Sequence, residues 1–231
     1  MIDKQLRHAD EAVADIHDGA VLMIGGFGPA GQPEDLLEAL IRRRPVGLTI
    51  VSNNAGNGDY GLAALLKAGC VKKIICSFPR QSDSWVFDEL YRRHDIELEL
   101  VPQGNLVARI QAGGSGLGAI YTPTGYGTVL AEGKETREFD GKNYVLEMPL
   151  KADFALIKAQ QADRWGNLVY QKTSRNFGPI MATASRCTIA QVSEISPLGD
   201  MDPEAIVTPG IYVKRLVHIP NQITRLSSQG A

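Results

Sequence analysis

A glycine-rich stretch near the start of the chain could bind an anion through its backbone. The apolar run 21–24 precedes it, as in a strand buried on both faces, and Pro33 with two acidic residues follows it, as at the start of a helix. Backbone N–H groups in such a loop can hold an anion or a developing oxyanion, and glycines let the backbone approach it. The candidate cofactor-binding residues of this loop are Gly25, Gly26, Phe27, Gly28 and Gly31.

Residues 26–31 also match the dinucleotide fingerprint G-x-G-x-x-G. That fingerprint needs an acidic residue about 20 positions further on, at the end of the next strand. Here the next apolar run, 48–51, is followed by Ser52–Gly56, and no acidic residue appears before Asp59. No Lys-Ser or Lys-Thr pair follows the glycines, so the P-loop pattern is missing too. An anion-binding loop and a tight turn without a ligand both stay open.

Hydrolytic and metal chemistry find little support in the sequence. The chain has no G-x-S-x-G motif, and its four histidines show no metal-ligand spacing. Cys70, Cys76 and Cys187 are odd in number and widely spaced, so they fit neither a metal site nor a redox pair. We expect reduced, mostly buried thiols and no metal site.

Alternating strands and helices must position the glycine loop in the first half of the chain. The expected strands are 21–24, 48–51, 72–76 and 97–101, and the expected helices are 6–16, 33–44, 62–69, 85–93 and 106–112. This alternation predicts an α/β fold with an open, mostly parallel sheet that is flanked by helices.

The second half changes character. A tight-turn pair, Asp140-Gly141, lies between 137–139 and 144–146, which predicts an additional β-hairpin region. Further strands are expected at 153–159, 168–170, 188–192 and 211–219. No linker divides the chain, so we expect residues 1–231 to form a single domain, with a flexible tail from about residue 220 to 231.

Composition narrows the possible partners and compartments. The 231 residues are 22% charged and 44% hydrophobic with a formal net charge of -2, and this balance argues against a nucleic-acid partner. No apolar run approaches the roughly 20 residues of a membrane span, and the start lacks a signal-peptide core. We expect a cytoplasmic protein without a membrane segment.

Longer strings resemble the first of the two subunits, named A or alpha, of the family I coenzyme A transferases. The resemblance begins with the glycine stretch and covers nearly the whole chain except the last dozen or so residues. The other matching stretches are Ser52–Gly56, Pro102–Leu106, Tyr121–Thr128, Ala152–Leu156, Asp163–Asn167 and Ser174–Phe177. Cys76–Ser84 is similar to the branch of the family that acts on 3-oxoadipate.

The resemblance implies a reaction that this chain cannot perform alone. Family members use a glutamate nucleophile in a Ser-Glu-Asn-Gly stretch, which is absent here and lies on a second chain, the B subunit, in two-chain members. The acidic candidates are Glu132, Glu135, Glu147 and Glu194. A polar loop on a solvated face explains Glu132 and Glu135, and edge exposure in a strand is expected for Glu147. We therefore expect no nucleophile in this chain, no permanently bound cofactor, a CoA thioester as substrate and an A2B2 heterotetramer.

Within that reaction, Gln103 is the candidate catalytic residue. It lies between Pro102 and Gly104 at the end of an expected strand, and the resemblance places it opposite the nucleophile across the interface with the second chain. There it would donate to the oxyanion that forms on the thioester. Asn53 and Asn54, at the end of a neighbouring strand, are candidate polar contacts of the substrate. Ordinary turns would explain all three residues without the resemblance.

The remaining substrate candidates are Arg80, Ser82 and Ser84, between an expected strand and an expected helix. A guanidinium suits the second carboxylate of 3-oxoadipate, although Arg80 could instead pair with Asp83. The resemblance implies CoA transfer from succinyl-CoA to 3-oxoadipate. The alternatives are transfer to acetoacetate or another short 3-oxo acid, and a non-catalytic CoA- or nucleotide-binding module or NAD-dependent enzyme that uses the glycine loop.

Overall fold

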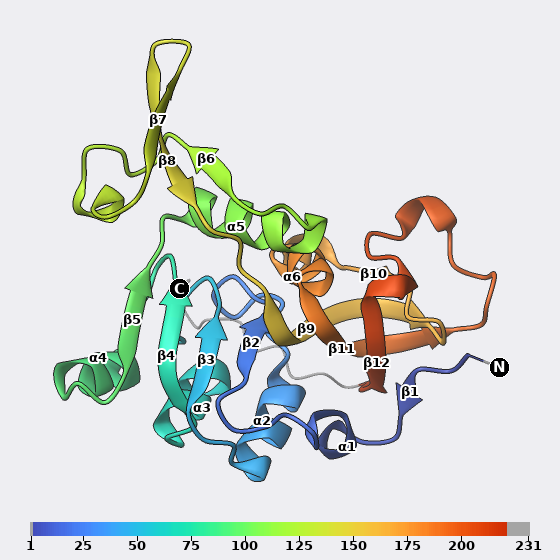
Figure 1. Cartoon of the computed structure of the whole chain (residues 1–231). Helices are drawn as coiled ribbons and strands as arrows, with labels where there is room; N and C mark the ends of the chain where they lie inside the picture. Colours follow the sequence, from blue (N-terminus) through green and yellow to red (C-terminus); the bar gives the residue numbers. More distant parts are fainter. Residues whose placement is uncertain (1, 221–231) are drawn as a thin grey trace, which may run out of the picture.

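A long, mostly parallel β-sheet forms the centre of the molecule (Figure 1). The computed structural model describes residues 2–220, so the tail expected from about residue 220 to 231 lies outside the described residues except for Pro220. The strands pair in the order β1-β12-β11-β9-β2-β3-β4-β5, and β10 pairs with β9. The strands are β1 Gln5–Leu6, β2 Val21–Ile24, β3 Leu48–Val51, β4 Val71–Cys76, β5 Glu97–Leu100, β9 Ala152–Asp163, β10 Leu168–Val169, β11 Ser185–Ser196 and β12 Val213–His218.

The order of the strands reverses beside the glycine stretch. The chain builds β2, β3, β4 and β5 outward in one direction, then returns to place β9 on the other side of β2 and continues through β11 to β12. Within residues 2–220, β10 is the only strand of this sheet that runs antiparallel to its neighbour. In open α/β sheets, ligands bind beyond the carboxyl ends of the strands at such a reversal. The loop after β2 therefore occupies a position that suits a binding site.

Helices cover both faces of the sheet, which confirms the predicted α/β class. They are α1 Ala9–Val13, α2 Glu34–Arg43, α3 Gly61–Lys67, α4 Trp85–Arg92, α5 Gln103–Ser115 and α6 Gly178–Thr183. Alternate strand residues face two separate cores, as expected for a sheet buried on both sides. In β2, Leu22 and Ile24 pack in the core that holds residues of α1 to α4, whereas Met23 packs in the core that holds residues of α5 and α6.

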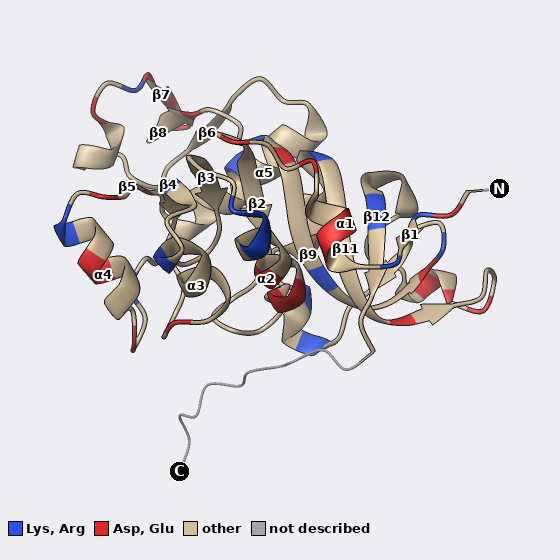
Figure 2. Ribbon diagram, turned by 90° about the horizontal axis from the view of Figure 1, so that it is seen from below, with Lys and Arg blue, Asp and Glu red and all other residues tan. Residues whose placement is uncertain are grey.

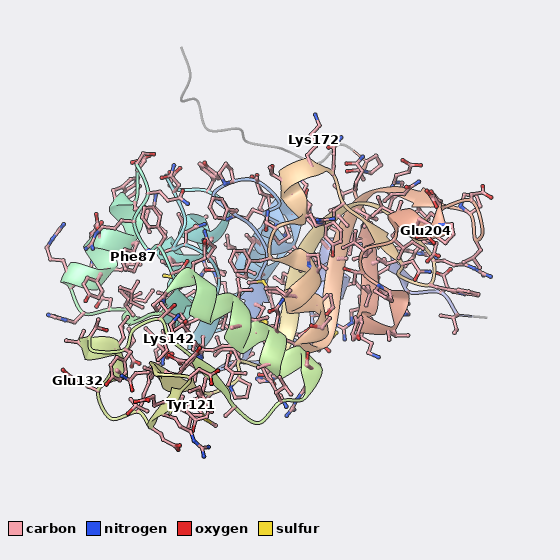
Figure 3. The ribbon with its side chains drawn as sticks, turned by 90° about the horizontal axis from the view of Figure 1, so that it is seen from above. Phe87, Tyr121, Glu132, Lys142, Lys172 and Glu204 are labelled. Carbon is pink, nitrogen blue, oxygen red and sulfur yellow. The ribbon has the colours of Figure 1, made fainter. Side chains whose placement is uncertain are left out.

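A small antiparallel sheet lies beside α5 (Figure 1). It consists of β6 Ile120–Thr122, β7 Thr136–Phe139 and β8 Lys142–Glu147, so the predicted hairpin is confirmed and β6 is an unpredicted third strand. Positive φ angles of 50° at Asp140 and 73° at Gly141 turn the hairpin, which explains the Asp-Gly pair. Tyr121 and Lys142 both belong to this sheet, which lies at the end of the molecule away from Glu204 (Figure 3).

Two predicted helices have different bounds. Helix α5 begins at Gln103, three residues before the predicted start, because the Pro102 carbonyl already accepts the Leu106 N–H at 2.9 Å. The first turn is polar, so apolar periodicity could not reveal it. The first helix is shorter than predicted, since Gln5–Leu6 pairs with β12 as a strand.

The expected edge exposure of Glu147 was wrong. Only 4% of this residue is exposed, because α5 and the loop before β7 cover it. Lys134 Nζ lies 2.7 Å from Glu147 Oε1, and Arg109 Nε lies 3.8 Å from Oε2. Arg109 also pairs with Glu99 at 3.0 Å, and Glu99 pairs with Lys73 at 2.6 Å. We call these five residues the charged clamp; it joins β4 and β5 to α5 and the small sheet.

Acidic and basic segments are interspersed over the elements (Figure 2). Glu34 and Asp35 lie in the first turn of α2, and Arg42 and Arg43 lie in its last turn, as its dipole favours. Among residues 2–220, no helix has the length and apolar character needed to cross a bilayer.

Candidate functional site

A cavity of about 710 Å³ lies at the carboxyl ends of β3 and β4, beside the glycine loop and the start of α5. Its polar lining residues are Asn53, Asn57, Ser77, Gln81, Ser82 and Gln103. Its apolar lining residues are Phe27, Gly28, Pro29 and Phe78. The cavity thus brings together five residues that the sequence suggested from four separate stretches. Those five are Phe27, Gly28, Asn53, Ser82 and Gln103.

Gln103 is the first residue of α5, and its carboxamide is held in one orientation. Its Nε2 donates to Asn53 Oδ1 at 2.7 Å, and Ser77 Oγ donates to the same oxygen at 2.8 Å. Because Asn53 Oδ1 only accepts, it selects the nitrogen end of the Gln103 carboxamide. A carboxamide nitrogen carries two hydrogens, so the second N–H of Gln103 is left for a ligand in the cavity. Gln103 is exposed, whereas Asn53 is buried.

The backbone fixes Asn53 in turn. Its carbonyl oxygen accepts the Ser77 N–H at 3.2 Å and the Phe78 N–H at 3.0 Å, which continues the pairing of β3 and β4 past the ends of both strands. Ser77 Oγ also lies 3.1 Å from that carbonyl oxygen. Since this segment is tied to the sheet, the Asn53 side chain is positioned before any ligand binds.

The glycine loop uses most of its own N–H groups. Gly25 N–H donates to the Leu156 carbonyl at 3.0 Å, and Gly26 N–H donates to Asn176 Oδ1 at 3.1 Å. Phe27 and Ala30 exchange backbone hydrogen bonds at 2.9 and 3.2 Å. Gly25 and Gly26 are buried and lie outside the cavity lining, whereas Phe27 is 54% exposed and borders the cavity.

Gly28 and Gly31 play different parts in this loop. A Cβ on Gly31 would lie 2.5 Å from the Ser174 carbonyl oxygen, and its φ is +77°, so close packing requires glycine there. Gly28 has a φ of +58° and lines the cavity, where its nearest side-chain atom would be Gln81 Nε2 at 3.8 Å. A ligand-facing role in the loop therefore stays a prediction that rests mainly on Gly28.

Three predicted substrate contacts lie outside the cavity lining, and two of them are Asn54 and Ser84. Asn54 Oδ1 accepts the Gly56 N–H at 2.8 Å, which closes the turn after β3. Ser84 is buried, where its Oγ accepts the Gln81 N–H at 2.7 Å and donates to the Gly56 carbonyl at 3.2 Å. Both side chains thus hold the two loops on which the cavity is built.

Arg80 is the third contact outside the lining. Its Nε lies 2.5 Å from Asp88 Oδ1, so its partner is Asp88 and not the suggested Asp83. Its guanidinium carbon lies 5.8 and 5.9 Å from the ring centroids of Phe87 and Tyr91, an arrangement that favours cation–π attraction. Phe87 itself is buried between α4 and the sheet (Figure 3).

Sequence reasoning missed several residues of the cavity: Pro29, Asn57, Ser77, Phe78 and Gln81. Four of them lie within stretches already singled out, but nothing in their types set them apart. Asn57 follows the Ser52–Gly56 stretch directly, and its Oδ1 accepts the Asp83 N–H at 2.9 Å. Proximity to a candidate stretch was the only signal for it.

The lining residues carry no ionisable side chain. Behind them, burial raises the pKa of the Cys76 thiol to about 12, so Cys76 stays protonated at neutral pH and cannot act as a thiolate. Within residues 2–220, no group of three or more histidine, cysteine, aspartate or glutamate side chains could hold a metal ion. The chemistry of this site is therefore hydrogen-bond donation, without a nucleophile or a base of its own.

Comparison with known proteins identifies the family. The model of the family described as coenzyme A transferase matches residues 6–218. The chain belongs to the coenzyme A transferase family. It is 68% identical over 219 residues to the A subunit of 3-oxoadipate CoA-transferase from Acinetobacter baylyi, an alignment that covers 95% of this chain and 96% of that protein.

Other members of the coenzyme A transferase family extend the comparison. The A subunit of succinyl-CoA:3-ketoacid coenzyme A transferase from Xanthomonas campestris is 51% identical, with 91% of this chain and 88% of that protein covered. Among solved structures, an acyl-CoA transferase of Escherichia coli O157:H7 in a thioester complex with CoA has a TM-score of 0.86 at 24% identity. That alignment covers 96% of this chain and 48% of the other, so this chain spans about half of its length.

Family membership decides one alternative. A dinucleotide fingerprint needs an acidic residue after the second strand to hold a ribose, and none follows Val51 before Asp59. The NAD-dependent and non-catalytic alternatives are thereby replaced by an enzyme of CoA transfer.

Proposed function

We propose that this chain is the A subunit of a heteromeric CoA-transferase that moves CoA from succinyl-CoA to 3-oxoadipate. The observation that carries the proposal is the Gln103 carboxamide, fixed by Asn53 with one N–H left toward the cavity. The 68% identity to the A subunit of an Acinetobacter 3-oxoadipate CoA-transferase supports the substrate. A fixed donor of this kind is what attack on a thioester carbonyl requires.

The chemistry passes through a series of oxyanions. A glutamate carboxylate from the second chain attacks the thioester carbonyl of succinyl-CoA, and the tetrahedral oxyanion collapses to an acyl-glutamyl anhydride as the CoA thiolate leaves. The thiolate then attacks the glutamyl carbonyl, which releases succinate and leaves CoA bound to the glutamate as a thioester. The second half of the reaction runs the same two steps in reverse with 3-oxoadipate. Its carboxylate attacks the glutamyl–CoA thioester and releases the CoA thiolate, which then attacks the 3-oxoadipyl carbonyl to give 3-oxoadipyl-CoA and the free glutamate. Each attack creates an oxyanion that Gln103 Nε2 can stabilise by hydrogen bonding.

The proposal requires a second chain, the B subunit. The cavity lining contains no carboxylate, so the nucleophile must come from outside these residues. We infer an A2B2 assembly in which residues 1–231 form one domain. The three cysteines are free, which supports a reducing, cytoplasmic compartment.

A second acceptor is worth testing because one observation favours it. The uncharged lining would suit acetoacetate or another short 3-oxo monocarboxylate, and a relative at 51% identity is named for 3-ketoacids. Comparing the two acceptors on the same preparation separates these functions.

The test is co-expression of this chain with the B subunit of a 3-oxoadipate CoA-transferase, followed by chromatography of the acyl-CoA products. We expect 3-oxoadipyl-CoA from succinyl-CoA and 3-oxoadipate, and no product from this chain alone. Borohydride reduction of the CoA-loaded enzyme should mark the second chain only. Transfer by this chain alone, or a mark on it, would refute the proposal. Faster turnover of acetoacetate than of 3-oxoadipate would favour the second acceptor.

A further inference from the structure

Three neutral hydrogen-bonding side chains border the cavity without partners for their donors. Within the described residues, no hydrogen bond involves the Gln81 carboxamide, the Ser82 hydroxyl or the Nδ2 of Asn57. Gln81 Nε2 lies near the glycine loop, 3.8 Å from where a Cβ of Gly28 would be. Together they offer amide and hydroxyl donors on one side of the same cavity that Gln103 borders.

The backbone that carries these donors is held firmly. The Gln81 N–H donates to Ser84 Oγ at 2.7 Å, and the Asp83 N–H donates to Asn57 Oδ1 at 2.9 Å. Gly58 N–H donates to the Asp83 carbonyl at 2.6 Å. These bonds join the loop after β3 to the loop after β4. The Asn57 carboxamide is therefore oriented with both N–H groups of its nitrogen end unused, whereas Gln103 has one unused N–H.

The donors face a lining with no charge to compete with them. No carboxylate borders the cavity, so an anion meets no repulsion from the lining, and Phe27, Pro29 and Phe78 supply apolar walls. Arg80, the nearest cation along the chain, is engaged by Asp88 and lies over two aromatic rings outside the lining. A carboxylate in this cavity would be bound by neutral donors, each of which forms a charge-assisted hydrogen bond.

We propose that Asn57, Gln81 and Ser82 form a subsite for the second carboxylate of a dicarboxylic acyl group, at the end remote from the carbon that receives CoA. This inference rests on the proposed function, because Gln103 must bind at the reacting end. The apolar residues that line the cavity together with both sets of donors suit a short aliphatic chain with a polar group at each end. A monocarboxylate of equal length would leave the subsite donors unpaired, which costs affinity.

The test compares two unreactive acids of equal chain length. Calorimetric titration of the two-chain complex with adipate and with hexanoate gives an affinity ratio that reports the second carboxylate alone. In the complex with Gln81→Met and Ser82→Ala, we expect this ratio to fall about 10- to 100-fold, the range of a charge-assisted hydrogen bond. Gln81→Glu should lower it further, since two carboxylates repel each other.

The matched control is Arg80→Met, on the same loop but outside the lining. It should leave the adipate-to-hexanoate ratio unchanged. A ratio near one in the unaltered complex, a ratio that survives Gln81→Met with Ser82→Ala, or a ratio lost in Arg80→Met would each overturn the subsite. If the ratio behaves as expected while the complex transfers no CoA to 3-oxoadipate, the subsite stands and the proposed acceptor falls.

Discussion

Two clusters of polar side chains include a residue of α5, and they differ in whether their polar groups all have partners. The charged clamp closes on itself: Glu147, Arg109, Glu99, Lys134 and Lys73 each lie within 4 Å of a residue of opposite charge. The cluster around Asn53 is neutral and ends at Gln103, whose second N–H has no partner among the described residues. A polar group without a partner at a cavity is available to a ligand, whereas a satisfied ion network is not. We therefore propose that the clamp contributes to stability and the Asn53 cluster to catalysis.

Removing Glu147 should damage the clamp most. In Glu147→Ala, Arg109 keeps Glu99 and the Met148 carbonyl as partners, but Lys134 loses its ion-pair partner. Breaking a buried ion pair from one side costs about 3–5 kcal/mol. We expect the free energy of unfolding to fall by that amount. The thermal midpoint of the two-chain complex should fall by about 6–20 °C, measured by calorimetry.

The control for this change is Glu138→Ala, on the exposed strand β7 of the same small sheet. It should leave the midpoint nearly unchanged. If both variants lose equal stability, the clamp is no more important than the surface, and the contrast between the two clusters fails.

Changing Gln103 should give the opposite pattern, a loss of rate without a loss of stability. Removal of one oxyanion donor typically lowers kcat by about 10²- to 10³-fold. We expect that loss in Gln103→Ala, and a larger one in Gln103→Glu because a carboxylate repels the oxyanion. Steady-state kinetics on the purified complex measures this loss, with Gln111→Ala, a change at an exposed residue of the same helix, as the control. An unchanged kcat would return Gln103 to a structural role.

The family resemblance together with the order of the strands predicted residues of the Asn53 cluster, whereas the sequence misplaced Glu147 of the charged clamp. Asn53 and Gln103 could be placed near each other because each follows an expected strand, and the carboxyl ends of parallel strands meet at one edge of a sheet. Glu147 was misplaced because alternation along a hairpin gives the two faces of a strand but not which face a distant helix covers. That information lies in the contact of β8 with α5, which no local pattern contains.

Ser77 was missed for a related reason. Its role comes from the register between the segments that follow β3 and β4, where its hydroxyl meets Asn53 Oδ1. Serine after a strand is common in turns and marks nothing by itself. The suggested partner of Arg80 was wrong in the same way: Asp83 is nearer in sequence, but Asp88 lies one helical turn inside α4, on the side where Arg80 lies.

A smaller effect should follow from Ser77→Ala. Asn53 Oδ1 would keep the hydrogen bond from Gln103 but lose the one from Ser77, so the carboxamides would be less well oriented. A net hydrogen bond of about 0.5–1.5 kcal/mol corresponds to a fall in kcat of about 2- to 13-fold. KM should stay the same. Ser77→Thr retains the hydroxyl and should recover the rate. A change in KM alone, or no recovery with threonine, would show that Ser77 does not position Gln103.

The smallest expected effect is on the pH dependence of stability, which should depend on the charged clamp and not on the Asn53 cluster. Burial alone would raise the pKa of Glu99, but its ion pairs with Lys73 and Arg109 outweigh burial and hold the pKa below its ordinary value of 4.5. A carboxyl whose pKa is lowered by folding stabilises the protein fully above its unfolded pKa, and this contribution is lost as the pH falls through the folded pKa.

The thermal midpoint of the unaltered complex should therefore decline below about pH 4.5, and more gradually in Glu99→Gln, which has no proton to take up at this position. Ser77→Ala should leave the slope of the wild type intact, because the Asn53 cluster contains no titrating group. Calorimetry of the three proteins between about pH 3 and 6 measures the slopes. A slope that Glu99→Gln does not alter would mean that acid acts elsewhere, and that the clamp does not depend on its charges.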